Sequence, residues 1–106
     1  MSENAHPVLS EQGAGTTEAD QRTALRFVLG RPGWRVVART AAGGATYLSV
    51  TTPCSRTGGQ RFWRVARTRQ GLLVDDEASG RRLGPAPTTR DALVEIWDAV
   101  TAAAPD

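Results

Sequence analysis

Arginine is the residue type that offers the most chemistry in this 106-residue sequence. All thirteen basic residues are Arg, and ten of them lie between residues 21 and 70, a stretch with no Asp or Glu. Acidic residues predominate on both sides of it, so a formal net charge of +2 conceals a strongly basic middle. A guanidinium group is always charged, binds phosphate through two parallel hydrogen bonds and stacks on bases. This distribution favours an anionic partner, nucleic acid above others.

Several of these arginines fall in segments where apolar residues alternate with polar ones, a pattern typical of β-strands. Side chains an even number of residues apart on a strand share a face, which groups Arg35 with Arg39, and Arg61 with Arg67. We expect these guanidinium groups to meet on the solvent side of a sheet. The predicted nucleic-acid-binding residues are Arg35, Arg39, Arg61, Arg64 and Arg67.

Four aromatic residues lie close to these arginines in the sequence: Trp34, Tyr47, Phe62 and Trp63. Large aromatic side chains at alternating strand positions are more often part of a core than of a binding surface. Only exposed aromatic rings are able to stack on bases. The exposure of these four side chains therefore decides whether they strengthen the nucleic-acid hypothesis.

A second interpretation assigns the arginines a structural role. Charged side chains on exposed strands prevent sheets from pairing edge to edge, and the acidic C-terminal part is able to neutralise the basic block within the fold. The alternative function is then a protein–protein adaptor, regulator or immunity-type protein. Its partner would dock on a strand edge or on the C-terminal helix that carries Trp97.

Residues with catalytic potential are few. The loop from Cys54 to Arg61 resembles the phosphate-binding loop of cysteine phosphatases, but Gln60 stands where those enzymes have their Arg. The acidic triplet Asp75, Asp76 and Glu77 fits a solvated hairpin tip, since no second acidic cluster accompanies it. The single histidine, His6, lies near the N-terminus, away from the predicted fold. We therefore predict a protein that is not an enzyme and has no metal site and no cofactor.

The elements that position these residues follow from hydrophobic periodicity and from turn residues. Helices are predicted over residues 17–29 and from Thr88 through Val100, where Leu93, Ile96, Trp97 and Val100 form an apolar stripe. Strands are predicted over residues 34–39, 45–52, 61–68 and 72–74, with a possible fifth over 81–83 that ends at Gly84-Pro85-Ala86-Pro87. The expected fold class is α+β: an antiparallel sheet of three to five strands, with an N-terminal and a C-terminal helix packed on one face.

The chain divides into a disordered acidic tail over residues 1–15 and a single α+β domain over residues 16–104. The tail has few strong hydrophobes and is unable to bury enough surface to offset the entropy of ordering. The sequence has one cysteine, no apolar run long enough to span a bilayer and no basic signal sequence. We therefore predict a cytoplasmic protein without a membrane partner.

Overall fold

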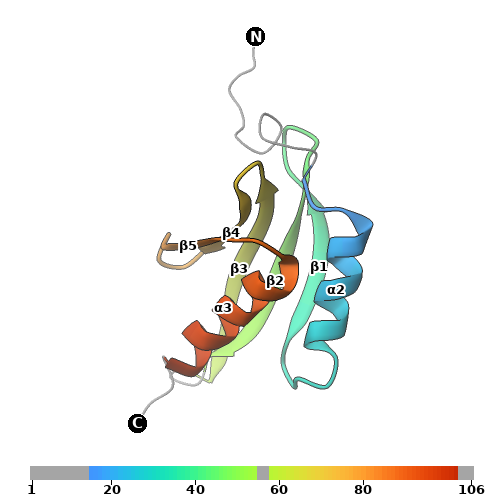
Figure 1. Cartoon of the computed structure of the whole chain (residues 1–106). Coiled ribbons are helices and arrows are strands. Elements are labelled where there is room, and N and C mark those ends of the chain that lie inside the picture. The colour runs from blue at the N-terminus through green and yellow to red at the C-terminus, as the bar shows by residue number, and fades with distance from the viewer. Residues whose placement is uncertain (1–14, 55–57, 103–106) are drawn as a thin grey trace.

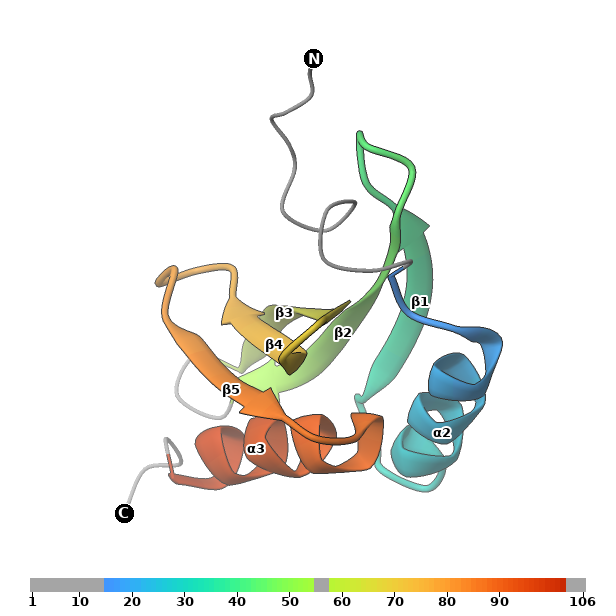
Figure 2. The same cartoon turned by 45° about the horizontal axis from the view of Figure 1, so that its top comes forward.

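The computed structural model describes residues 15–54 and 58–102. The elements run in the order α2 (Glu18–Val28), β1 (Arg35–Thr40), β2 (Thr46–Cys54), β3 (Gly59–Thr68), β4 (Gly71–Asp76), β5 (Arg82–Ala86) and α3 (Thr89–Ala102). The five strands form one antiparallel sheet in sequence order, β1-β2-β3-β4-β5. Both helices lie on the same side of this sheet (Figures 1 and 2). The predicted α+β class is confirmed, with five strands.

Helix α2 begins where the sequence predicts. Thr17 is its N-cap: the Thr17 hydroxyl accepts a hydrogen bond from the backbone N–H of Asp20, and the Asp20 carboxylate accepts one from the N–H of Thr17. This capping box satisfies two backbone donors that a helix start otherwise leaves open. Gly30, with a φ of 81°, follows the helix and turns the chain toward β1.

The N-terminal boundary differs from the prediction by one residue. Gly15, expected in the tail, forms a parallel bridge with Thr46 at the start of β2. The neighbouring Thr16 backbone N–H donates to the Thr46 carbonyl at 3.0 Å, so Gly15 and Thr16 join the sheet. The remainder of the predicted tail, residues 1–14, lies outside the described residues.

The strands extend further than the turn residues indicate. Strand β2 includes Pro53 and Cys54, and β3 starts at Gly59, although residues 53–59 were expected to form a loop. Strand β5 continues through Gly84 and Pro85 to Ala86, where the sequence predicts a break. Because β5 is an edge strand, a proline without an N–H is tolerated there, and the pairing of β4 with β5 is irregular between Leu72 and Val74.

Helix α3 covers the sheet with the apolar stripe seen in the sequence. The Thr88 hydroxyl accepts a hydrogen bond from the Asp91 N–H at 3.1 Å and so caps the helix. Leu93 and Ile96 are completely buried, whereas Trp97 at the margin keeps 39% of its surface exposed.

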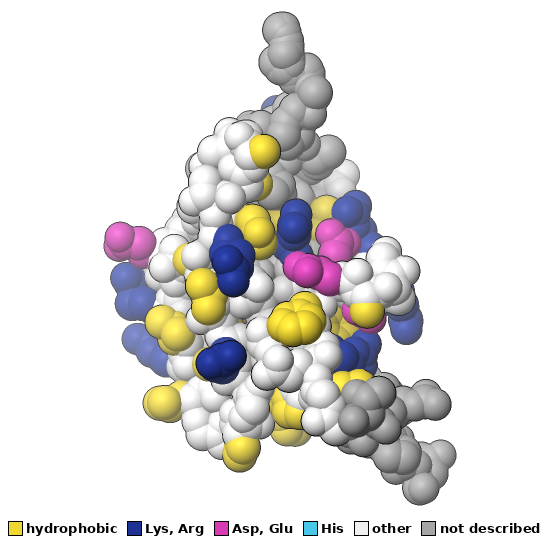
Figure 3. Space-filling model, turned by 180° about the vertical axis from the view of Figure 1, so that it is seen from behind, with side chains coloured by type: hydrophobic (Ala, Val, Ile, Leu, Met, Phe, Trp, Pro, Cys, Tyr) yellow, Lys and Arg dark blue, Asp and Glu magenta, His cyan; other side chains and the backbone are white. Residues whose placement is uncertain are grey.

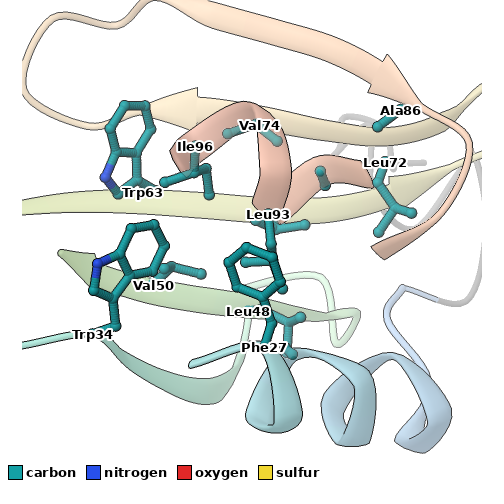
Figure 4. Packing of buried hydrophobic residues seen from close by; sticks show 13 residues of the cluster. Phe27, Trp34, Leu48, Val50, Trp63, Leu72, Val74, Ala86, Leu93 and Ile96 are labelled. Atoms are coloured by element: carbon teal, nitrogen blue, oxygen red, sulfur yellow. The ribbon is translucent and has the colours of Figure 1, made fainter. Parts of the chain in front are cut away.

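The core lies between the sheet and the two helices (Figure 4). Val50, Trp63 and Val74 rise from successive strands toward α3, and Phe27 and Trp34 close the side near α2. The indole N–H of Trp63 donates to the Thr52 hydroxyl at 3.0 Å, so the largest buried side chain has its polar atom satisfied. Neither described helix is long and apolar enough to cross a bilayer.

Candidate functional site

The sheet has one covered and one open face, and strand alternation decides which residues lie on each. Leu48, Trp63 and Val65 point toward the helices and are buried. The residues between them face the opposite side of the sheet, where Figure 3 shows basic, acidic and hydrophobic side chains interspersed. Five residues on β1, β2 and β3 combine positive charge with aromatic rings there, and we call them the open-face patch: Arg35, Arg39, Tyr47, Phe62 and Arg64.

Strand pairing fixes the layout of the open-face patch. Arg35 pairs with Thr51, which in turn pairs with Phe62, so these three lie in one row across the sheet. Arg39 pairs directly with Tyr47. The two β1 arginines are four positions apart, which places their Cα atoms about 13 Å apart along the strand at about 3.3 Å per residue.

Arg64 lies on β3, in the row between those of Phe62 and Tyr47. Its guanidinium carbon is 4.4 Å from the centroid of the Tyr47 ring, a cation–π contact. Its Nε is 4.0 Å from an oxygen of Glu77, and more than two-fifths of each of these two side chains is exposed. Such an exposed ion pair contributes little, so Arg64 is available to a stronger anionic partner.

Arg61 and Arg67, expected on the solvent side, lie on the helix-covered face. They share strand parity with Trp63 and Val65, and these two residues fill the core. Arg61 stacks over the Trp63 ring at 4.4 Å and donates to Asp76 at 3.0 Å. The structure therefore brings three of the five predicted arginines together on the open face and places the other two at the margins of the core.

Arg67 belongs to a polar cluster that the sequence did not reveal. Its Nε and one terminal nitrogen donate to the two carboxylate oxygens of Asp20, at 2.9 and 2.6 Å. The Thr89 hydroxyl, at the start of α3, donates to the same carboxylate at 2.8 Å. One buried aspartate thus joins α2, β3 and α3.

The ionisation of Asp20 reflects these contacts. Burial by itself raises the pKa of this carboxyl, but the hydrogen bonds from Arg67, Thr17 and Thr89 outweigh it and hold the pKa far below its usual range. The hydrogen bond from Asp20 likewise raises the pKa of Arg67 above its ordinary value. The pair therefore stays fully charged at neutral pH and acts as a structural link.

The acidic triplet is neutralised by arginines instead of forming a solvated tip. Asp75 accepts two hydrogen bonds from Arg82, Asp76 accepts one from Arg61, and Glu77 lies near Arg64. Burial raises the pKa of Asp76, but the Arg61 hydrogen bond and those from Ala78 and Ser79 outweigh it, so the net shift is downward. Within residues 15–54 and 58–102, no group of three His, Cys, Asp or Glu side chains is arranged to hold a metal ion.

The four aromatic residues divide between core and surface. Trp34 and Trp63 are buried, as the strand pattern favours for large rings, and they are unable to stack on bases. Phe62 keeps 45% of its surface exposed on the open face, and Tyr47 is half-buried beside Arg64. Exposed aromatic surface is thus present among the arginines of the open-face patch.

Strand β1 is an edge of the sheet, and a hollow of about 480 Å³ runs along it. Its lining combines Leu25 and Val28 of α2 with Val37, Arg39 and Phe62 of the sheet. Leu25 and Val37 are each about half exposed. Exposed apolar side chains thus adjoin the open-face patch at this edge.

Two other residues considered in the sequence contribute no site. Cys54 is half-buried at the end of β2, and residues 55–57 of its loop lie outside the described part of the chain. His6 lies outside it as well.

Comparison of the chain with protein-family models, with curated proteins and with solved structures gave no significant match.

Proposed function

We propose that this protein is a non-enzymatic binding module whose open-face patch holds an anionic partner, and that this partner is single-stranded nucleic acid. The observation that carries the proposal is that Arg35, Arg39 and Arg64 share one sheet face with the exposed ring of Phe62, and that neither of the described helices covers this face. None of these three arginines makes a close ion pair with another described residue; the nearest contact is the 4.0 Å approach of Arg64 to Glu77.

The open-face patch carries groups that are complementary to both the phosphate and the base of a nucleotide. The guanidinium groups match the geometry and charge of phosphate oxygens, and aromatic faces stack on bases of any sequence. A duplex keeps its bases stacked inside, where Phe62 and Tyr47 are unable to reach their faces. A single strand exposes both phosphates and bases to a broad, shallow sheet, which favours it over a duplex.

The test is a fluorescence-anisotropy titration of labelled single-stranded DNA, single-stranded RNA and duplex DNA at about 50 mM and about 200 mM salt. We expect micromolar or tighter binding of a single strand, weakening steeply at the higher salt. The logarithm of the binding constant should fall linearly with the logarithm of the salt concentration. Arg35→Gln and Arg39→Gln should each make this slope less steep by about one. Phe62→Ala removes one aromatic ring that would stack on a base, so it should weaken the binding of a single strand by about 1–3 kcal/mol.

The matched control is Arg22→Gln on α2, which removes one exposed arginine outside the open-face patch. It should leave the salt slope of the open-face patch unchanged. Absence of binding at low salt would reject the proposal. An equal effect of Arg22→Gln and Arg39→Gln would show non-specific attraction to the whole basic block.

A protein partner at the β1 edge is the second candidate function. The outer edge of β1, which pairs with no other strand among the described residues, adjoins exposed Leu25 and Val37, and β1 carries two arginines that suit an acidic extended segment. Leu25→Ser distinguishes the two candidates. It should weaken capture of a protein partner at this edge and leave the nucleic-acid titration as it is.

A further inference from the structure

A second group of arginines lies on the helix side of the molecule, away from the open-face patch. A hollow of about 270 Å³ is lined by Thr23, Arg26 and Phe27 of α2, by Arg31 of the turn that follows, and by Arg90 at the start of α3. The lining thus holds three guanidinium groups and no acidic side chain. The volume of the hollow is several times the roughly 30 Å³ that one water molecule occupies in the liquid.

Arg31 is held in place by contacts that leave part of its hydrogen-bonding capacity unused. Its guanidinium carbon is 4.1 Å from the centroid of the Phe27 ring and 5.2 Å from that of Trp97. One of its terminal nitrogens donates to the Phe27 carbonyl. Its Nε is buried and has no hydrogen-bond partner among the described residues. A buried donor without an acceptor costs about 1–3 kcal/mol, and more when it is charged.

The three arginines also differ from others in the fold in their lack of counter-charge. Arg61, Arg67 and Arg82 each bind an aspartate within 3.0 Å. In contrast, Arg26, Arg31 and Arg90 make no ion pair within the described residues.

The neighbouring acids do not supply this counter-charge. Asp91 follows Arg90 but is exposed and does not line the hollow. The carboxylate of Asp20, one turn before Thr23, already accepts hydrogen bonds from Arg67, Thr89 and Thr17. The three guanidinium groups around the hollow repel each other, because they carry the same charge. An anion bound between them attracts all three and so offsets this repulsion.

We propose that this hollow is a binding site for a phosphate group. Arg26 and Arg90 would approach it from the two helices, Arg31 would contribute its guanidinium charge, and the Thr23 hydroxyl would donate an additional hydrogen bond. Phosphate suits the site because guanidinium groups bind its oxygens in pairs. Arg90 lies in the first turn of α3, where the helix dipole adds to the attraction for an anion. The site is separate from the open-face patch, and its existence does not depend on the proposed nucleic-acid function.

Tryptophan fluorescence of the full chain provides the readout, since Trp97 contacts Arg31 and also lies 5.6 Å from Trp34 between ring centroids. We would titrate the protein with inorganic phosphate and, at matched ionic strength, with chloride. The proposal predicts a saturable change with phosphate and none with chloride. Arg90→Gln and Arg26→Gln should each weaken phosphate binding about tenfold, which corresponds to about 1.4 kcal/mol. Both residues are exposed, so the variants are expected to fold.

Arg22→Gln is the matched control, because it removes one exposed arginine of α2 that does not line the hollow and should leave phosphate binding unchanged. A change that fails to saturate, or that Arg22→Gln reduces as much as Arg90→Gln does, would overturn the proposal. A parallel competition with a short oligonucleotide, with and without a 5′-phosphate, identifies the source of the group. Displacement of inorganic phosphate only by the 5′-phosphorylated strand would assign the site to strand ends. Equal displacement by both strands would assign it to backbone phosphates, and displacement by neither would assign it to small phosphate compounds.

Discussion

Arg67 and Asp20 are 47 positions apart in the sequence, yet two guanidinium nitrogens of Arg67 bind the two carboxylate oxygens of Asp20. This contact ties the third strand to the first turn of α2, and the Thr89 hydroxyl extends it to α3. An arginine that composition alone assigns to a binding surface is thus part of the fold.

Asp20→Asn should destabilise the protein by roughly 2 kcal/mol, because it leaves the Arg67 charge without its partner. This is less than the about 3–5 kcal/mol typical of a fully buried pair, since about a third of Arg67 is exposed. Urea unfolding at pH 7 measures the effect. Glu18→Gln, which removes an exposed acid of the same helix near Arg22, should change stability by less than about 0.5 kcal/mol. Equal effects of the two substitutions would contradict a special role for Asp20.

The same carboxyl predicts an acid dependence of stability. Because folding lowers the pKa of Asp20, its contribution is fully present above the unfolded value of about 3.9 and is lost as the pH falls toward the folded value. The stability difference between wild type and Asp20→Asn should therefore be constant from pH 7 to about 5 and shrink below about 4. Urea titrations across this range measure it. A difference that stays constant down to about pH 3 would rule out the charged carboxylate as its cause.

Thr52→Val should cost about 1–3 kcal/mol although it changes the volume of the side chain little, since it removes the acceptor of the buried Trp63 indole N–H. Thermal unfolding measures this loss. The control is Thr51→Val on the open face, where the side chain is half-buried and the same exchange should be almost neutral. If the two variants unfold at the same temperature, the indole hydrogen bond contributes nothing to stability.

Gly71→Ala should be more destabilising than Gly44→Ala. Both glycines have a positive φ, which costs an alanine about 1–2 kcal/mol. A Cβ at Gly71 would also lie 2.6 Å from the Ala86 carbonyl oxygen, whereas a Cβ at Gly44 would meet nothing within 4 Å. Denaturant midpoints of the two variants compare them directly. Equal midpoints would show that β5 shifts to admit the methyl group.

The sequence was sufficient to predict the elements and the parity of the strands. Capping residues mark the starts of both helices. The alternation of apolar and polar residues predicts that Trp34 and Val36 lie on one face of the first strand and Arg35 and Val37 on the other, which the structure shows. These features depend on neighbours within a few residues, which a sequence displays directly. The extension of β5 through Pro85 was missed, because only its place at the edge of the sheet makes a proline acceptable there.

The candidate site was predicted less completely. The grouping of Arg61 with Arg67 was correct, but the choice of face depends on where α2 and α3 pack, which is a long-range property. One local signal was present: Arg61 and Arg67 share parity with Trp63 and Val65, the best core candidates of the strand. The cluster around Arg31 had no such signal, since residues 23–31 and Arg90 meet only through helix packing.

The meander order of the sheet also bears on how the protein is made. Each strand pairs with the one synthesised just before it, so hairpins are able to form as the chain leaves the ribosome. Leu93 and Ile96, which cover the apolar face of that sheet, come at the very end of the fold. Until α3 emerges, the nascent sheet presents Leu48, Val50 and Val65 without the cover that this helix provides, and transiently exposed apolar surface of this kind is prone to aggregation.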